Sequence, residues 1–201
     1  RNLSESDVFD RIKHETGIFY NIPPRVDSLL NYAFTEILNN AIEHSQSETI
    51  KTVMERTRGI IKFEITDYGI GIFNNIKKKF RLHDIYEAIN EVLKGKKTTM
   101  PERHSGEGIF FTSKAADVFT IQSSNKKILF NNHIEDIFLS KTSFAKGTRV
   151  TFSVSEKSAK SLKKIFDEYT DDEFRFSKTK VFVKFYSIGD EFISRSQARR
   201  I

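Results

Sequence analysis

The sequence contains no cysteine, only three prolines and no long apolar segment. Without cysteine, the chain can form no disulfide, offers no thiolate nucleophile and cannot bind zinc through sulfur. No apolar run approaches the roughly 20 residues that a bilayer-spanning helix needs. The first ten residues are too polar for a secretory signal. We therefore expect a cytoplasmic protein that does not interact with a membrane.

The charged residues are numerous but not concentrated. The 201 residues are 38% hydrophobic and 30% charged, which is an ordinary globular composition. The net charge of +6 invites a nucleic-acid interpretation. However, the lysines are scattered and form no basic stripe with interleaved aromatic rings, so base stacking has no platform. The chain lacks an initial Met and ends inside a predicted helix, so we expect a piece of a longer protein, with nucleic-acid binding only through missing regions.

The pattern of apolar residues predicts alternating helices and strands. Pro23 and Pro24 are suited to the start of a helix, and helical apolar spacing follows them. Glycines at 69 and 71 predict a loop, and the polar stretch 94–105 predicts a mobile one. Helices are predicted over 25–44, 83–93, 107–119, 155–169 and from 194, and strands over 49–55, 60–66, 119–123, 127–131, 148–154 and 181–185. This order favours an α+β fold, with helices on one face of a mixed or antiparallel sheet.

A polar stripe follows the first strong helix. Glu36, Asn40 and His44 are spaced four apart and therefore lie on one face. A solvated helix face is the simpler explanation, but asparagine is a poor helix former in mid-helix. Asn40 offers an oxygen of the kind that Mg²⁺ prefers. Glu36, one turn earlier, has the chemistry of a general base.

Three glycine-containing segments add to this stripe. Asp67 ends a predicted strand and is followed at once by Gly69 and Gly71, which permit close backbone approach to a ligand. A carboxylate there can accept a hydrogen bond from an amine such as that of adenine, although a surface turn with a helix-capping Asp has the same pattern. Residues 105–109 contain two glycines and continue directly into a predicted helix. The N-terminus of a helix favours the binding of anions. Gly147 and Thr148 open a later strand.

These four motifs, in this order, resemble the GHKL superfamily of ATPases and kinases. That superfamily includes gyrase-type and MutL-type ATPases, histidine kinases and anti-sigma-factor serine kinases. Its N box, Glu-x-x-x-Asn-Ala-x-x-His, is matched at every position by EILNNAIEH over residues 36–44. The glycine motifs are DYGIGI over 67–72 and GEGI over 106–109. The resemblance covers residues 20–155 and implies a Bergerat-type two-layer α/β sandwich that binds ATP with Mg²⁺.

The resemblance also implies roles for individual residues. Asp67 would bind the adenine amino group with support from Thr148, and Asn40 would coordinate Mg²⁺. Glu36 would orient or deprotonate the attacking nucleophile, with His44 in a supporting role. The residues implied to frame the nucleotide and its phosphates are Gly69, Gly71, Ile72, Gly106 and Gly108. One departure is Glu107, which places a negative charge between the lid glycines.

The C-terminal residues resemble the start of a STAS-like domain of unknown function. The resemblance rests on FSKT at 176–179, VFVKF at 181–185 and ISRSQAR at 193–199. We therefore expect an ATP-binding domain over 1–155, a linker helix over 156–173 and a truncated STAS-like segment over 174–201. Because STAS domains are partners of anti-sigma-factor kinases, a regulatory protein partner is implied.

Three functions remain open for such a chain. It is expected to be a module of a bacterial signal-transduction or transcription-regulatory protein that acts as an ATPase switch. The alternatives are a serine or histidine protein kinase and an ATP-gated, DNA-associated regulator. His14 is the one candidate for a phosphoacceptor histidine, but too few residues separate it from Pro24 for the helical hairpin that histidine kinases need.

Overall fold

The computed structural model describes residues 4–95 and 107–170, together with the backbone of residues 185–188 and 191–194. The predictions for residues 96–106 lie outside the described residues, as do most of those for 171–201. The helices are α1 (Glu5–Glu15), the short 3-10 helix η1 (Gly17–Phe19), α2 (Pro24–His44), α3 (Ile72–Lys79), α4 (Ile85–Lys94), α5 (Gly108–Ala115) and α6 (Leu162–Tyr169). The strands are β1 (Ile50–Thr57), β2 (Ile60–Asp67), β3 (Val118–Ser123), β4 (Lys126–Asn131), β5 (Asp136–Lys141), β6 (Thr148–Ser155), β7 (Phe185–Ile188) and β8 (Glu191–Ser194).

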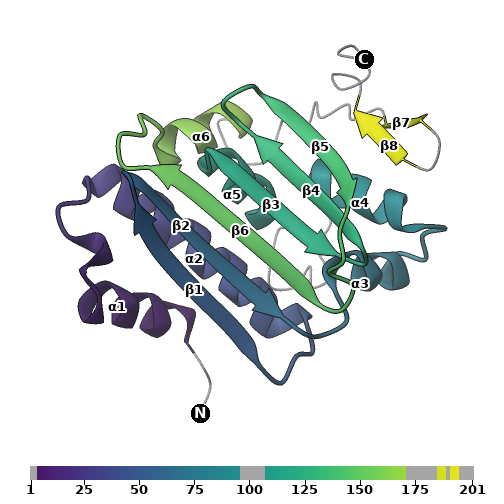
Figure 1. Cartoon of the computed structure of the whole chain (residues 1–201), viewed down its shortest axis with the longest axis horizontal. Coiled ribbons are helices and arrows are strands. Elements are labelled where there is room, and N and C mark those ends of the chain that lie inside the picture. The colour runs from purple at the N-terminus through teal and green to yellow at the C-terminus, as the bar shows by residue number, and fades with distance from the viewer. Residues whose placement is uncertain (1–3, 96–106, 171–184, 189–190, 195–201) are drawn as a thin grey trace.

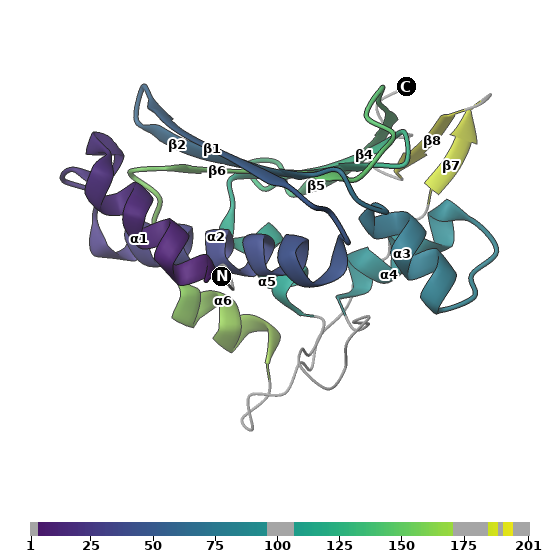
Figure 2. The ribbon, with the colours of Figure 1, turned by 90° about the horizontal axis from the view of Figure 1, so that it is seen from below.

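Six strands form one sheet in the order β1-β2-β6-β3-β4-β5 (Figure 1). Every pairing in it is antiparallel, which decides between the mixed and antiparallel sheets expected from the sequence. Figure 2 shows the helices gathered below one face of this sheet. The predicted α+β, two-layer sandwich is therefore confirmed. Strands β7 and β8 form a separate antiparallel pair beside β5.

Phenylalanine rings join the two layers. Phe63 of β2 and Phe152 of β6 are register partners whose rings stack at 5.0 Å. Phe34 of α2 lies edge-on against Phe63 at 5.4 Å, and Phe9 of α1 packs against Phe34. Each buried Phe ring contributes on the order of 1.5–3 kcal/mol of transfer free energy. This column of rings fixes α2 over β2 and β6.

Helix α2 begins where the prolines predict and ends at His44. Eight of its apolar side chains are buried against the sheet, at positions 26, 29, 30, 33, 34, 37, 38 and 41. Glu36 and Asn40 lie beside this apolar face and are half-buried. The helix that forms much of the core therefore also carries the polar stripe.

Several elements were not predicted or differ in length. Helix α1, helix α3 and strand β5 had no counterpart in the predictions. Helix α6 is shorter than the predicted helix over 155–169, because Ser161 caps its N-terminus by accepting a hydrogen bond from the Lys164 N–H. At the C-terminus, residue 194 ends strand β8, where a helix was expected to begin. Within the part of the chain that the structure describes, no helix has the length and apolar character to cross a membrane.

Candidate nucleotide site

The polar stripe on α2 holds an asparagine with a defined orientation. The Asn40 Nδ2 group donates to the backbone carbonyl of Glu36 at 2.8 Å. This bond uses the amide nitrogen, which leaves the oxygen Oδ1 as the acceptor end of the side chain. Glu36 lies one turn closer to the start of the helix on the same face.

Asp67 is the most deeply buried carboxylate of the predicted site. It ends β2, pairs with Thr148 at the start of β6 and is 4% exposed. Its Oδ1 accepts a hydrogen bond from the Gly69 N–H at 3.0 Å, and the carboxylate also accepts from the N–H and hydroxyl of Thr148. Burial raises the pKa of Asp67, and these hydrogen bonds oppose the rise. The result is an oriented acceptor in a poorly hydrated place.

Thr148 connects Asp67 to the glycine loop. While its hydroxyl donates to Asp67, the same oxygen accepts a hydrogen bond from the Ile72 N–H at 2.9 Å. This fixes the start of α3 against the start of β6. The structure thus brings together three residues that the sequence proposed for one site.

The glycines of this loop are required by close packing. A Cβ at Gly69 would overlap the carbonyl group of Ser45. Gly71 has a φ of +80°, and a Cβ there would lie 2.5 Å from Ser123 Oγ and 2.9 Å from the Gly147 carbonyl. The sequence suggested that these glycines let the backbone approach a ligand. In the structure, their first role is to let backbone segments approach one another.

Three hydrogen bonds attach the end of α2 and the residues just after it to the glycine loop and to α3. The Ile70 N–H donates to the Ser45 carbonyl at 2.9 Å, and the Tyr68 N–H donates to Ser47 Oγ at 3.0 Å. Asn75 of α3 donates its side-chain amide to the His44 carbonyl at 3.2 Å. The sequence did not reveal these contacts, because each joins residues more than twenty positions apart with no motif of their own. They hold the Asn40 end of α2 beside the Asp67 loop.

Helix α5 closes the other side of the stripe. A Cβ at Gly108, the first residue of α5, would overlap the Glu36 carboxylate. The Glu36 side chain therefore lies against the N-terminus of a helix, where the helix dipole favours negative charge. Glu107 immediately precedes the helix, and Gly106 lies outside the described residues.

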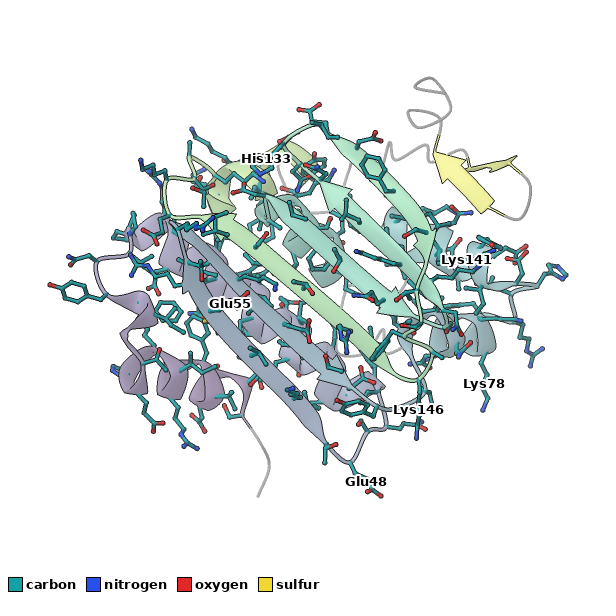
Figure 3. All side chains as sticks on the ribbon, viewed as in Figure 1. Glu48, Glu55, Lys78, His133, Lys141 and Lys146 are labelled. Carbon is teal, nitrogen blue, oxygen red and sulfur yellow. The ribbon has the colours of Figure 1, made fainter. Side chains whose placement is uncertain are left out.

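The segments that form the site meet at one end of the sheet. Figure 3 shows Glu48, which follows α2, and Lys146, which precedes β6, at the end where β2 finishes and β6 begins. Among the described residues, no group of three or more His, Cys, Asp or Glu side chains could bind a metal ion unaided. Asn40 can thus supply at most part of a metal's coordination.

These features together define a nucleotide-binding α/β sandwich. They are an antiparallel sheet with helices on one face, a carboxylate buried at a strand end and a glycine loop attached to a polar helix. The chain matches the model of the histidine kinase-like ATPase domain over residues 21–130, more than half of its length. It therefore belongs to this family, and it is a kinase-like, ATP-binding module. No curated protein matches the chain.

Proposed function

We propose that this chain is a Mg²⁺-dependent ATP-binding module of a bacterial signalling or transcription-regulatory protein and acts as an ATPase switch. The observation that carries the proposal is the buried, oriented carboxylate of Asp67, which lies next to a glycine loop attached to the Asn40 helix. Little water reaches such a buried hydrogen-bond acceptor. The site therefore discriminates strongly between a nucleotide base that carries a matching hydrogen-bond donor and one that does not.

Adenine recognition is assigned to the Asp67 end of the site. Asp67 would accept a hydrogen bond from the exocyclic amine, with Thr148 holding the carboxylate in place. Gly69, Gly71 and Ile72 would form the wall around the base. The Ile72 N–H is already bonded to Thr148, so this residue would contribute its side chain and its position.

The phosphates and the metal are assigned to the α2 and α5 end. Asn40 Oδ1 would be the protein oxygen on Mg²⁺, which typically retains waters and phosphate oxygens as its other ligands. The absence of a larger ligand cluster among the described side chains fits a metal held chiefly by the nucleotide. The bound metal would neutralise phosphate charge. Gly108, with Gly106, would let the phosphates approach the N-terminus of α5.

Glu36 would act as the general base of the site. It lies against the N-terminus of α5, where the terminal phosphate is expected. Its carboxylate would accept the proton of an attacking water in an ATPase, or of a serine hydroxyl in a kinase. The match to a histidine kinase-like domain favours protein kinase activity as the second candidate function.

The C-terminal part is proposed to connect the nucleotide site to a partner. The division remains an ATP-binding domain over 1–155, a linker helix over 156–173 and the start of a STAS-like domain over 174–201. Two aromatic contacts between α6 and α5 support a physical link: Phe166 packs on Phe111 at 4.5 Å and Tyr169 on Phe110 at 5.0 Å. A regulatory protein is the proposed partner, and an ATP-gated, DNA-associated role would need regions outside this sequence.

Incubation of the protein with γ-labelled ATP and Mg²⁺ tests this proposal. An ATPase switch releases the label as phosphate, whereas a kinase transfers it to the chain or to an added protein. Omission of Mg²⁺ should abolish both reactions. Failure of the protein to bind ATP at millimolar concentration would refute the proposed function.

A further inference from the structure

Lys160 fastens the end of helix α5 to the start of helix α6. It stands directly before Ser161, the residue that caps the N-terminus of α6. Its ammonium group donates hydrogen bonds to two carbonyls at the end of α5, that of Lys114 at 3.3 Å and that of Ala116. A cation at this end of a helix also interacts favourably with the helix dipole. The last turn of α5 is therefore bound to the first residues of the linker helix.

The surroundings of Lys160 hold its ammonium group in this position. Asp117, just before β3, forms an ion pair with it in which Oδ1 and Nζ are 3.3 Å apart. The other oxygen of Asp117 accepts a hydrogen bond from the Ser155 N–H at the end of β6, at 2.8 Å. Burial lowers the pKa of Lys160, and the charge of Asp117 opposes this fall. The ammonium group is thus paired and partly withdrawn from water, where its hydrogen bonds are stronger than at an exposed site.

Aromatic rings join the same two helices at their other ends. Tyr169, the last residue of α6, packs edge-on against Phe110 in the first turn of α5, with ring centroids 5.0 Å apart. Between the two ends, Phe166 contacts Phe111 at 4.5 Å. Phe110 is also enclosed by Gly95 at the end of α4, where a Cβ would lie 2.6 Å from the Phe110 Cβ. Helices α5 and α6 therefore run in opposite directions and are held together at both ends.

The first turn of α5 is also the part of the helix that faces the proposed phosphate site. Gly108 lies so close to the Glu36 carboxylate that a Cβ there would overlap it, and Phe110 follows two residues later. With eight residues, α5 is only about 12 Å long. A displacement of so short a helix at one end is carried to the other. A shift of α6 therefore moves the N–H groups that would bind phosphate oxygens.

We propose that α6 regulates the nucleotide site through α5: the two helices move as one unit, fastened by Lys160 at one end and by Tyr169 at the other. The inference rests on the proposed function, in which the N-terminus of α5 binds the terminal phosphate of ATP. The contacts with α6 hold α5 in position for that phosphate, so a change that displaces α6 weakens ATP binding. By thermodynamic linkage, ATP opposes the displacement of α6 to the same extent. Because α6 leads into the C-terminal part of the chain, a protein bound there would act on the nucleotide site by this route.

Replacement of Lys160 by Met tests the proposal, because it removes the cation and keeps most of the length of the side chain. We expect the affinity for Mg²⁺-ATP to fall about fivefold, the lower end of the usual coupling between two sites. The affinity for ADP, which lacks the terminal phosphate, should stay within about twofold. Lys163→Met is the matched control, because the Lys163 side chain is 85% exposed and pairs with Asp167 of its own helix. Calorimetric titration measures these affinities, and an unchanged preference of Lys160→Met for ATP over ADP would overturn the proposal.

Amide hydrogen exchange in the nucleotide-free protein separates this inference from the proposed function. Lys160→Met should speed exchange about 10-fold or more in both α5 and α6, because hydrogen bonds to a charged group are lost, and should leave β1 unchanged. Tyr169→Leu, at the other end of the helix pair, should have the same effect, so the answer does not depend on one variant. Faster exchange in only one of the two helices would overturn the proposal. A wild type that binds no ATP would refute the proposed function, and exchange alone would then decide whether the two helices form one unit.

Discussion

Replacement of Asp67 by Asn should weaken ATP binding by about 10- to 100-fold. Asn has the same shape, and its Oδ1 can still accept the bond from the Gly69 N–H. Its NH₂ group, however, replaces an acceptor with a donor that repels both the adenine amine and the Thr148 donors. A hydrogen bond to a charged group contributes about 1.5–3 kcal/mol. Because Asp67 is 4% exposed, little water is available to compensate for the loss.

The same substitution should change how the stability of the fold depends on pH, because it removes a titrating group from a buried place. Burial raises the pKa of Asp67, so the ionised carboxylate is costlier in the folded than in the unfolded chain. A group whose pKa is higher in the folded than in the unfolded chain makes its full contribution to folding stability at a pH below its unfolded pKa. That contribution is lost as the pH rises through the pKa of the folded state. The stability of the Asn variant relative to the wild type should therefore be more favourable near pH 7 than below about pH 4. Thermal unfolding across this range measures it.

Calorimetric titration with the Mg²⁺ complexes of ATP and of inosine triphosphate provides the decisive comparison. Inosine carries an oxygen where adenine has the amine, so the wild type should prefer ATP and Asp67→Asn should lose that preference. Asp136→Asn is the matched control, because Asp136 is a buried Asp on the same sheet but on β5, outside the site. Equal ATP affinity in the wild type and Asp67→Asn, or an unchanged preference for ATP, would show that Asp67 does not recognise adenine.

Three further substitutions test other parts of the site. Asn40→Ala should remove most of the gain in ATP affinity that Mg²⁺ provides, with unfolding unchanged; a wild type whose affinity is insensitive to Mg²⁺ would contradict the assignment. Glu36→Ala should retain ATP binding and lose turnover by about 100- to 10,000-fold, as measured by phosphate release, whereas normal turnover would leave Glu36 without a catalytic role. Gly69→Ala should destabilise the protein by about 1–3 kcal/mol, because its Cβ would overlap the Ser45 carbonyl. Gly17→Ala, where nothing lies within 4 Å of the added Cβ, is the control in denaturant unfolding.

The parts of the site that share one element could be predicted from the sequence. Pro24 and the 3.6-residue apolar period define α2, so the placement of Glu36 and Asn40 on one face follows from spacing alone. The end of β2 at Asp67 follows from the alternation that precedes it and the glycines that follow. Thr148 could be assigned to the start of a strand because it follows Gly147 and precedes a similar alternation of side chains.

The remaining features depend on contacts that spacing does not encode. Helix α3 was missed because only Phe73 and Ile76 mark its buried side, and Lys77–Lys79 make the segment look like a polar loop. Strand β5 was missed because its buried positions do not alternate regularly.

Amide NMR titration of the protein with ATP and Mg²⁺ tests whether the nucleotide binds at the end of the sheet where Asp67 lies. We expect shifts that saturate together at Asn40, Gly69, Gly71 and Gly108, with additional shifts at Thr148 and little change at Thr120 in the middle of β3. ADP should reproduce the shifts around Gly69 and Gly71 more fully than those at Gly108, since it lacks the terminal phosphate. Shifts centred elsewhere on the sheet, or none at millimolar nucleotide, would contradict the assignment of an ATP site to this end of the molecule.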